Sequence, residues 1–179
     1  MNYNMADEDK IYDACMDNKN RGFRMLMDAY QKPVYFFVRR MVVVHDDAED
    51  VTQETFIKVY RSLDQFRHES SLQTWIFKIA TNESLRLLHS RNMAETELAD
   101  ELSEKLMASD FVDYDNALAV TFQKAILSLP EKQRTVFNLR YYEELEYSEI
   151  SKITGIKAET LKVDYHFAKD KIKNYILKE

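Results

Sequence analysis

The sequence predicts an all-α protein built from two small helical domains. Its 179 residues include only two glycines and two prolines, too few for a turn-rich β-sandwich or barrel. Apolar residues recur in steps of three and four, which is typical of one buried helix face, and no alternating stretch is long enough to indicate a sheet. Hydrophobic residues make up 45% and charged residues 31% of the chain, a composition typical of globular proteins.

Charge divides the chain into three parts. Residues 1–92 hold 13 basic and 14 acidic side chains, residues 93–115 hold 1 and 8, and residues 116–179 hold 11 and 9. The net charge of −6 therefore comes from the short middle segment. We predict an N-terminal domain over residues 1–92, an acidic linker over 93–115 and a C-terminal domain over 116–179.

Three helices are predicted in the N-terminal domain. The first covers Gly22–Val44, and Pro33 is expected to kink or break it. The second covers 46–66 and begins with two aspartates, which are favoured at a helix N-cap. After a short loop, the third covers 72–91 and is capped by Ser71.

The C-terminal domain ends in a predicted helix-turn-helix. Helices over 116–128 and 131–142 precede two further helices, Tyr147–Thr154 and Ala158–Lys178, which are separated by a turn at Gly155. On the last helix, one face is apolar and the other is basic. The basic face forms a cationic stripe of Lys162, His166, Lys169 and Lys173. On an arbitrary helix such a stripe is usually only a solvated lysine face. Here the preceding helix and the glycine turn favour DNA binding instead, because the major groove of DNA admits a helix and lysines neutralise phosphates.

The third helix of the N-terminal domain carries a second candidate site. Lys78, Asn82, Arg86 and His89 share one polar face, and Phe66 and Trp75 lie just before it or at its start. This combination suits single-stranded DNA. Cations can follow the phosphates, a base can stack on the rings, and the amide can form a hydrogen bond with a base. By periodicity alone the two rings are core residues, and a buried ring can also form the floor of a pocket.

Acidic side chains line the exposed side of the predicted second helix. They are Asp46, Asp47, Glu49, Asp50 and Glu54, together with Gln53. Such a face is usually only solvated. Because it would repel DNA, any partner that it binds should be a basic protein surface.

Several classes of function are disfavoured. The single cysteine, Cys15, and four scattered histidines provide no disulfide, no metal site and no nucleophile–base pair, so we expect no enzyme, cofactor or small-molecule substrate. The longest apolar stretch, Pro33–Val44, contains two arginines and is too short to span a membrane. The acidic N-terminus does not resemble a signal peptide, so a cytoplasmic location is expected.

Three segments resemble bacterial RNA polymerase sigma factors: DAEDVTQETFIKVYRSLDQF (47–66), TWIFKIATN (74–82) and LPEKQRTVFNLRYYEELEYSEISKITGIKAETLK (129–162). The two-domain length is similar to that of the extracytoplasmic-function (ECF) subfamily, which keeps only the second and fourth sigma domains. The resemblance implies a protein that binds core RNA polymerase and directs promoter recognition, DNA melting and transcription initiation. It also implies control by an anti-sigma protein. A stand-alone helix-turn-helix regulator is the alternative, although such a regulator needs neither the Trp75–Asn82 segment nor the acidic face.

The resemblance also implies roles for individual residues. Asp50, Gln53 and Glu54 match positions that bind the clamp helices of the polymerase β′ subunit, and contacts with the β subunit are expected as well. The residues matched to the minus-ten promoter element are Phe66, Arg67, His68, Trp75, Lys78, Asn82 and Arg86. The residues matched to the minus-thirty-five element are Lys157, Thr160, Lys162, Val163, His166, Phe167 and Lys169.

Four residues depart from the family pattern. Glu146 and Lys157 occupy helix caps where serine or threonine is usual, so each helix is expected to lose about 1 kcal/mol of capping energy. Val163 and Asp164 replace a common serine and arginine on the DNA-reading helix. Asp164 would repel phosphate and Val163 could contact a thymine methyl group, so the promoter sequence does not carry over from other members.

Overall fold

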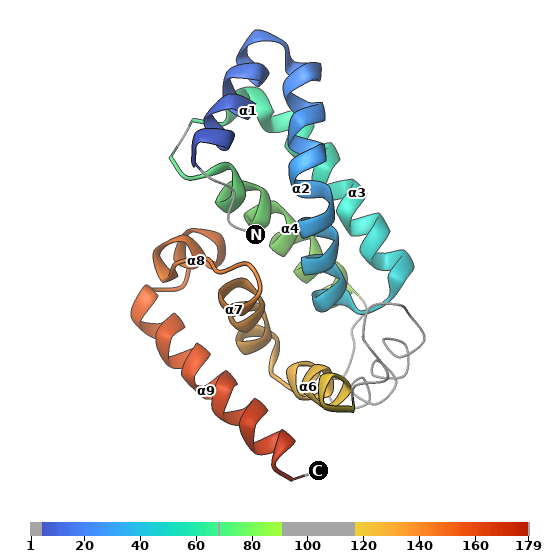
Figure 1. The fold of residues 1–179 in the computed structure, drawn as a ribbon, viewed down its shortest axis with the longest axis vertical. Helices are drawn as coiled ribbons and strands as arrows, with labels where there is room; N and C mark the ends of the chain where they lie inside the picture. Colours follow the sequence, from blue (N-terminus) through green and yellow to red (C-terminus); the bar gives the residue numbers. More distant parts are fainter. Residues whose placement is uncertain (1–4, 68, 91–116, 179) are drawn as a thin grey trace.

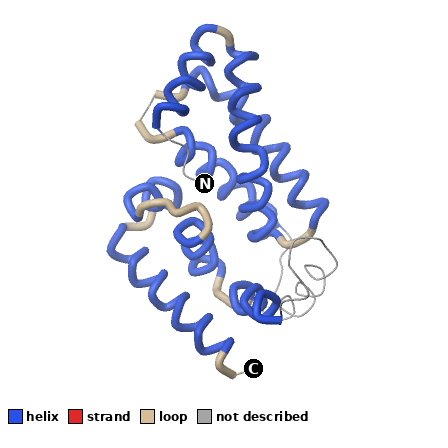
Figure 2. The backbone as a smooth tube through the Cα atoms, in the orientation of Figure 1, coloured by secondary structure: helices blue, strands red, loops and turns tan. Residues whose placement is uncertain are grey.

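The structure, a computed structural model, describes residues 5–67, 69–90 and 117–178 (Figure 1). Over those residues the backbone is helical with short connecting loops and contains no strand (Figure 2), as predicted. The N-terminal domain consists of α1 (Met5–Asp17), α2 (Lys19–Val42), α3 (His45–Ser62), the 3₁₀ turn η1 (Leu63–Gln65) and α4 (Leu72–Ser90). The C-terminal domain consists of α6 (Ala117–Leu127), α7 (Glu131–Tyr141), α8 (Tyr147–Thr154) and α9 (Ala158–Ile176). The predicted acidic linker, 93–115, lies outside the described residues.

Helix α2 forms the centre of the N-terminal domain. Its buried face repeats in steps of three and four, and Leu26, Tyr30, Val34 and Phe37 are all 1% exposed or less. Helices α1, α3 and α4 all pack against α2. The ring of Phe37 contacts that of Phe77 on α4, with centroids 5.2 Å apart.

Pro33 is predicted to kink or break the helix, and the break is wrong. Helix α2 continues through this proline without interruption from Lys19 to Val42. A proline inside a helix removes one backbone hydrogen bond and costs about 3 kcal/mol. Val34 and Phe37, one turn or less beyond Pro33, are completely buried, and the burial of a side chain of this size contributes about 1.5–3 kcal/mol. Packing therefore outweighs the local preference.

The start of α3 also differs from the prediction. Val44 is the N-cap and offers no side-chain hydrogen bond, so Asp46 and Asp47 lie inside the first turn. In the first turn, the positive end of the helix dipole still stabilises their negative charges. The predicted cap of α4 is confirmed, because the hydroxyl of Ser71 accepts a hydrogen bond from the Thr74 amide at 3.0 Å.

Helix α1 is absent from the prediction, although it holds α4 in place. The Glu8 carboxylate accepts hydrogen bonds from the amides of Leu72 and Gln73, at 3.0 and 3.1 Å, at the start of α4. It also accepts one from the Tyr30 hydroxyl at 2.6 Å. Cys15, on the same helix, is 6% exposed, and burial raises the pKa of its thiol, as expected of an inert core cysteine.

The helix-turn-helix of the C-terminal domain has the predicted geometry. Gly155 adopts φ = 72°, a left-handed conformation that favours glycine, between α8 and α9. Lys157 caps α9 without a side-chain hydrogen bond, as predicted. The expectation for α8 is wrong, because the Glu149 carboxylate accepts a hydrogen bond from the Glu146 amide at 2.9 Å and so closes a capping box.

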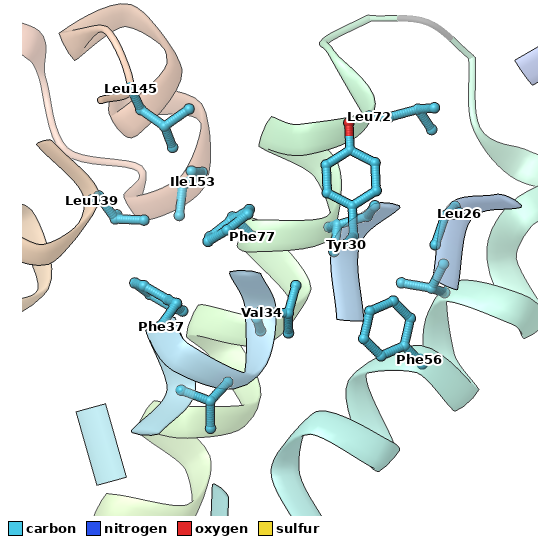
Figure 3. Packing of buried hydrophobic residues seen from close by; sticks show 14 of the residues in the cluster. Leu26, Tyr30, Val34, Phe37, Phe56, Leu72, Phe77, Leu139, Leu145 and Ile153 are labelled. Carbon is cyan, nitrogen blue, oxygen red and sulfur yellow. The ribbon is translucent and has the colours of Figure 1, made fainter. Parts of the chain in front are cut away.

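The two domains pack against each other. Helix α8 lies beside α4 and α7 lies beside α2 (Figure 1). Figure 3 shows Phe37 and Phe77 of the N-terminal domain on the side that faces Leu139 and Ile153 of the C-terminal domain, and all four belong to one apolar cluster. A second cluster, formed by α6, α7 and α9, lies entirely within the C-terminal domain. The hydrophobic core is therefore continuous across the domain boundary.

Candidate nucleic-acid and polymerase interfaces

A pocket with an aromatic wall lies at the start of α4. It has a volume of about 360 Å³, and we call it the Trp75 pocket. It is lined by Gln65, Phe66, Arg67, Glu69, Ser70, Thr74, Trp75, Lys78 and Lys152. The rings of Phe66 and Trp75 lie 4.9 Å apart with planes tilted by 37°. Phe66 is 8% exposed and Trp75 is half-buried, so the two rings belong to the core and also line the pocket.

The structure places the predicted minus-ten residues in two groups. Phe66, Arg67, Trp75 and Lys78 meet at the Trp75 pocket, and both cations are exposed there. Asn82 is exposed one turn further along α4 but does not line the pocket. His68 lies outside the described residues.

Arg86 is directed to a different partner. Its Nε and Nη2 atoms donate to one oxygen of the Glu83 carboxylate at 2.9 and 2.7 Å, and Lys58 of α3 donates to the other oxygen at 2.5 Å. Burial alone would raise the pKa of Glu83, but the hydrogen bonds and charges of Lys58 and Arg86 lower it below its ordinary value. Arg86 therefore pairs with Glu83 within α4, whereas the bond that joins α4 to α3 is the one from Lys58 to Glu83. Arg86 lines a hollow with Asp50 and Gln53 rather than the Trp75 pocket.

The acidic face of α3 is present, with one correction. Asp46, Glu49 and Asp50 are exposed, whereas Asp47 is buried at 9% exposure and so does not belong to this face. Among the three residues matched to polymerase binding, Asp50 and Gln53 are exposed, and Glu54 is half-buried at 4.0 Å from Lys58.

Beside the acidic face runs a groove between α2 and α3, which we call the α2–α3 groove. Its volume is about 1090 Å³. Asp50 and Gln53 lie on its edge, and so do Glu49 and Arg61. Most of its apolar lining comes from Phe23, Met27, Tyr35, Phe56, Ile57 and Tyr60. An apolar groove beside an acidic helix face can bind an amphipathic basic helix by both hydrophobic burial and charge.

Helix α9 presents the predicted cationic stripe to solvent. Lys162, His166, Lys169 and Lys173 are exposed, opposite the buried Leu161, Ala168 and Ile172. Two apolar side chains interrupt the stripe, since Val163 and Phe167 are 52% and 51% exposed. The remaining residues matched to the minus-thirty-five element, Lys157 and Thr160, are exposed near the start of the helix. Apolar groups that sit beside lysines on an exposed helix can contact bases while the lysines contact phosphates.

Comparisons with known proteins identify the family of this chain. The family model for sigma-70 region 2 matches residues 26–93, and the model for sigma-70 region 4 matches residues 119–172. The ECF RNA polymerase sigma-E factor of Escherichia coli is 31% identical over 173 residues, which cover 87% of each chain. This chain belongs to the ECF family of RNA polymerase sigma factors. The ECF sigma factor SigW of Bacillus subtilis is also similar to it, at 28% identity over 165 residues, with 86% of this chain and 88% of that one covered.

Two solved structures share the fold of this sigma factor. CnrH, in complex with the cytosolic domain of CnrY, has a TM-score of 0.73 at 17% identity, and the match covers 97% of this chain and 99% of CnrH. RpoE of Bartonella quintana, in complex with the anti-sigma factor NepR, has a TM-score of 0.68 at 23% identity, with 87% and 96% covered.

Two features are absent from the described residues of this sigma factor. No histidine, cysteine and carboxylate side chains gather there in a group of three that could hold a metal ion. None of its described helices is both long and apolar enough to cross a membrane.

The α2–α3 groove is the feature of this sigma factor that sequence reasoning missed. The signal was present, because Ile57 and Tyr60 lie outside the inward stripe of α3 and are 38% and 37% exposed. Exposed large apolar side chains beside an acidic face indicate a binding surface rather than a merely solvated helix. The wall from α2 could not be assigned, because it depends on how the two helices pack.

Proposed function

We propose that this sigma factor uses three separate surfaces to bind core RNA polymerase, to recognise and melt a two-part promoter and so to start transcription. The observation that supports this division most directly is the Trp75 pocket. It combines two aromatic rings with exposed cations, and it lies on α4, away from the acidic face of α3. A protein that only binds duplex DNA has no need of such a pocket.

The acidic face and the α2–α3 groove bind the polymerase in this proposal. Asp50, Gln53 and Glu54 contact the clamp helices of the β′ subunit, and the apolar floor of the groove receives side chains from the same partner. Acidic groups at the edge of a hydrophobic surface give orientation and speed to association with a basic partner. They also keep DNA away from this side of the domain.

The Trp75 pocket captures one unstacked base of the minus-ten element. The base stacks on the ring of Trp75 or Phe66. Arg67 and Lys78 hold the flanking phosphates, and Asn82 contacts a neighbouring nucleotide. Base stacking on an aromatic ring contributes about 1–3 kcal/mol, enough to offset the few kcal/mol needed to unstack one base. Capture of the flipped base therefore favours the melted state.

Helix α9 reads the minus-thirty-five element in the major groove. Lys157, Thr160, Lys162, His166 and Lys169 contact phosphates or base edges, and Val163 and Phe167 contact apolar groups such as thymine methyls. Since no reaction is catalysed at any of these surfaces, the protein is not an enzyme in this proposal. It acts in the cytoplasm, where promoter DNA and polymerase meet. An anti-sigma protein, of the kind bound to RpoE of Bartonella quintana, inhibits it.

In this proposal the second sigma domain covers residues 1–92 and the fourth covers 116–179, which is supported by family-model matches over 26–93 and 119–172. The function is tested by mixing the purified protein with bacterial core RNA polymerase, followed by size-exclusion chromatography and run-off transcription on fragmented genomic DNA. We expect co-elution and discrete new transcripts that core polymerase alone does not make. Sequence-specific DNA binding by the free protein without co-elution would instead indicate a stand-alone regulator.

A further inference from the structure

We infer that Glu159 selects a cytosine in the minus-thirty-five element, within one row of side chains in which Val163 and Phe167 select thymines. The inference rests on the function proposed above, in which α9 lies in the major groove of that element. Glu159 is not among the residues that the family resemblance matches to this element, so it is a further specificity-determining residue of this chain.

Glu159, Val163 and Phe167 form one row along the outward face of α9. They follow one another in steps of four, so they lie on the same side of the helix, opposite the buried Leu161 and Ile172. Val163 and Phe167 are 52% and 51% exposed, and Glu159 is exposed as well. Because each residue turns a helix by about 100°, the lysines of the cationic stripe lie about a quarter turn to one side. The row, rather than the stripe, therefore points straight away from the core of the domain.

The place of this row in the fold suits contact with bases. Helix α9 packs against α6, α7 and α8 and lies along one edge of the molecule (Figure 1). In a helix-turn-helix, residues near the start of the second helix contact base edges, while cations beside them contact phosphates. Glu159 is the second residue of α9, and Val163 lies about one turn further along. When the lysines follow a phosphate backbone, the row therefore faces the floor of the groove.

The Glu159 carboxylate is available to a base. Within the described part of the chain its side chain forms no ion pair or hydrogen bond, whereas Asp170, further along the same face, lies 3.2 Å from His166. A carboxylate repels phosphates, so it weakens DNA binding unless it accepts a hydrogen bond from a base. The donors in the major groove are the amino groups of cytosine and adenine, and adenine carries the acceptor N7 beside its amino group. Since N7 repels a carboxylate, cytosine is the base that Glu159 favours.

Val163 and Phe167 favour thymine for a different reason. Thymine carries a methyl group in the major groove, and apolar side chains contact that group. Four residues of a helix advance about 6 Å, a little less than two steps of about 3.4 Å between stacked bases. We therefore expect the cytosine and the thymines within about five base pairs of one another.

A role in helix stability alone predicts a different result for Glu159. An acidic side chain in the first turn is stabilised by the positive end of the helix dipole. That role changes the stability of α9 but not the choice of base. The DNA sequence that the protein selects therefore separates the two roles.

The experiment compares Glu159→Gln with Asp164→Asn in holoenzyme assembled from the full chain and bacterial core RNA polymerase. Both variants lose one negative charge on α9, but Asp164 lies about a quarter turn from the row. Each holoenzyme selects DNA from a pool based on a promoter found by the run-off transcription above, with its minus-thirty-five segment randomised. We expect the wild type and Asp164→Asn to favour cytosine at one position by about fivefold or more. Glu159→Gln should favour adenine there, because glutamine pairs with N6 and N7 of adenine.

Replacement of thymine by deoxyuracil in the selected element tests the apolar part of the row. Deoxyuracil lacks only the methyl group, so the wild-type holoenzyme should bind it about fourfold more weakly for each thymine contacted. The double variant Val163→Ala with Phe167→Ala should bind both DNAs equally. Both side chains are more than half exposed, so the core of the domain does not depend on them.

The outcomes separate the inference from the function on which it rests. A wild-type element without a preferred cytosine, an unchanged preference in Glu159→Gln, or the same change in Asp164→Asn would overturn the role of Glu159. Wild-type binding that does not depend on the thymine methyl groups would overturn the role of Val163 and Phe167. A holoenzyme that selects no sequence beyond those retained by core polymerase alone would reject the proposed function, and the inference with it.

Discussion

The contact between α3 and α4 includes one buried charge, the carboxylate of Glu83. Its side chain is 6% exposed, and it accepts hydrogen bonds from Lys58 at 2.5 Å and from Arg86 at 2.9 and 2.7 Å. Lys58 and Arg86 are 40% and 68% exposed, so both can turn to water if the carboxylate is lost. The loss should therefore equal the net value of charged hydrogen bonds, about 2 kcal/mol, rather than the 3–5 kcal/mol typical of a fully enclosed pair.

We expect Glu83→Gln to lower the free energy of unfolding by about 2 kcal/mol at neutral pH, measured by urea denaturation followed by circular dichroism. Glu54→Gln is the matched control, because Glu54 also lies near Lys58 but at 4.0 Å and 38% exposed. Its loss should cost only about 0.3–0.5 kcal/mol, the value of an exposed helical ion pair. Equal effects of the two substitutions would refute the reasoning that burial makes the difference.

The pH dependence gives a second check on Glu83. Its pKa in the folded state is lower than its ordinary value of 4.5, because Lys58 and Arg86 outweigh the effect of burial. A lowered folded pKa stabilises the protein fully above about pH 4.5 and loses that contribution as pH falls through the folded pKa. The difference between wild type and Glu83→Gln should therefore shrink in acid. A difference that stays constant down to pH 3 would show that the Glu83 charge does not contribute.

Four further variants test the proposed surfaces and the turn. Asp50→Ala with Glu54→Ala should weaken polymerase binding about tenfold or more while circular dichroism stays native; retained affinity would remove the acidic face from the interface. Asn82→Ala should reduce open-complex formation, measured by permanganate footprinting, more than initial duplex binding; equal losses would argue against a role in melting. Lys162→Ala should weaken promoter duplex binding and reduce its salt slope by about 1, and an unchanged slope would exclude a phosphate contact. Gly155→Ala should destabilise the C-terminal domain by about 1 kcal/mol in thermal unfolding because of its positive φ, and no change would mean that the turn relaxes.

Controls for the two DNA predictions exist on the same helices. Lys173 belongs to the cationic stripe but lies near the end of α9, and Lys173→Ala should leave base-edge contacts intact. Ser90 lies at the end of α4, far along the helix from the Trp75 pocket, and Ser90→Ala should leave melting unchanged. If these controls were as defective as Lys162→Ala and Asn82→Ala, general damage would explain the losses.

Local patterns predicted the helices well where a buried stripe and a turn signal agreed. The bounds of α8 match the prediction, because Gly155 marks the end of the helix and Ile150 and Ile153 mark its buried side. The patterns failed at Pro33, where complete burial of the neighbouring side chains overrides a local breaker. They also missed α1, in which Glu8 acts through backbone amides more than sixty residues away.

The candidate site was predicted in part for the same reason. Phe66 directly follows η1, and Trp75 and Lys78 lie one turn apart on α4. The three residues are close in sequence, so their spacing alone predicts that they share one pocket. Arg86 shares the same helix face by spacing, yet Glu83, one turn before it, binds its guanidinium. Periodicity places a side chain on a face, but a neighbouring charge decides where a long, flexible arginine points.

The contact between the domains was beyond the reach of periodicity for a physical reason. Asn138 and Glu143 are polar, so a pattern based on hydrophobic residues places them at the surface, although Asn138 is completely buried and Glu143 nearly so. In the sequence such residues look like exposed ones, and only the structure shows the buried environment that they share.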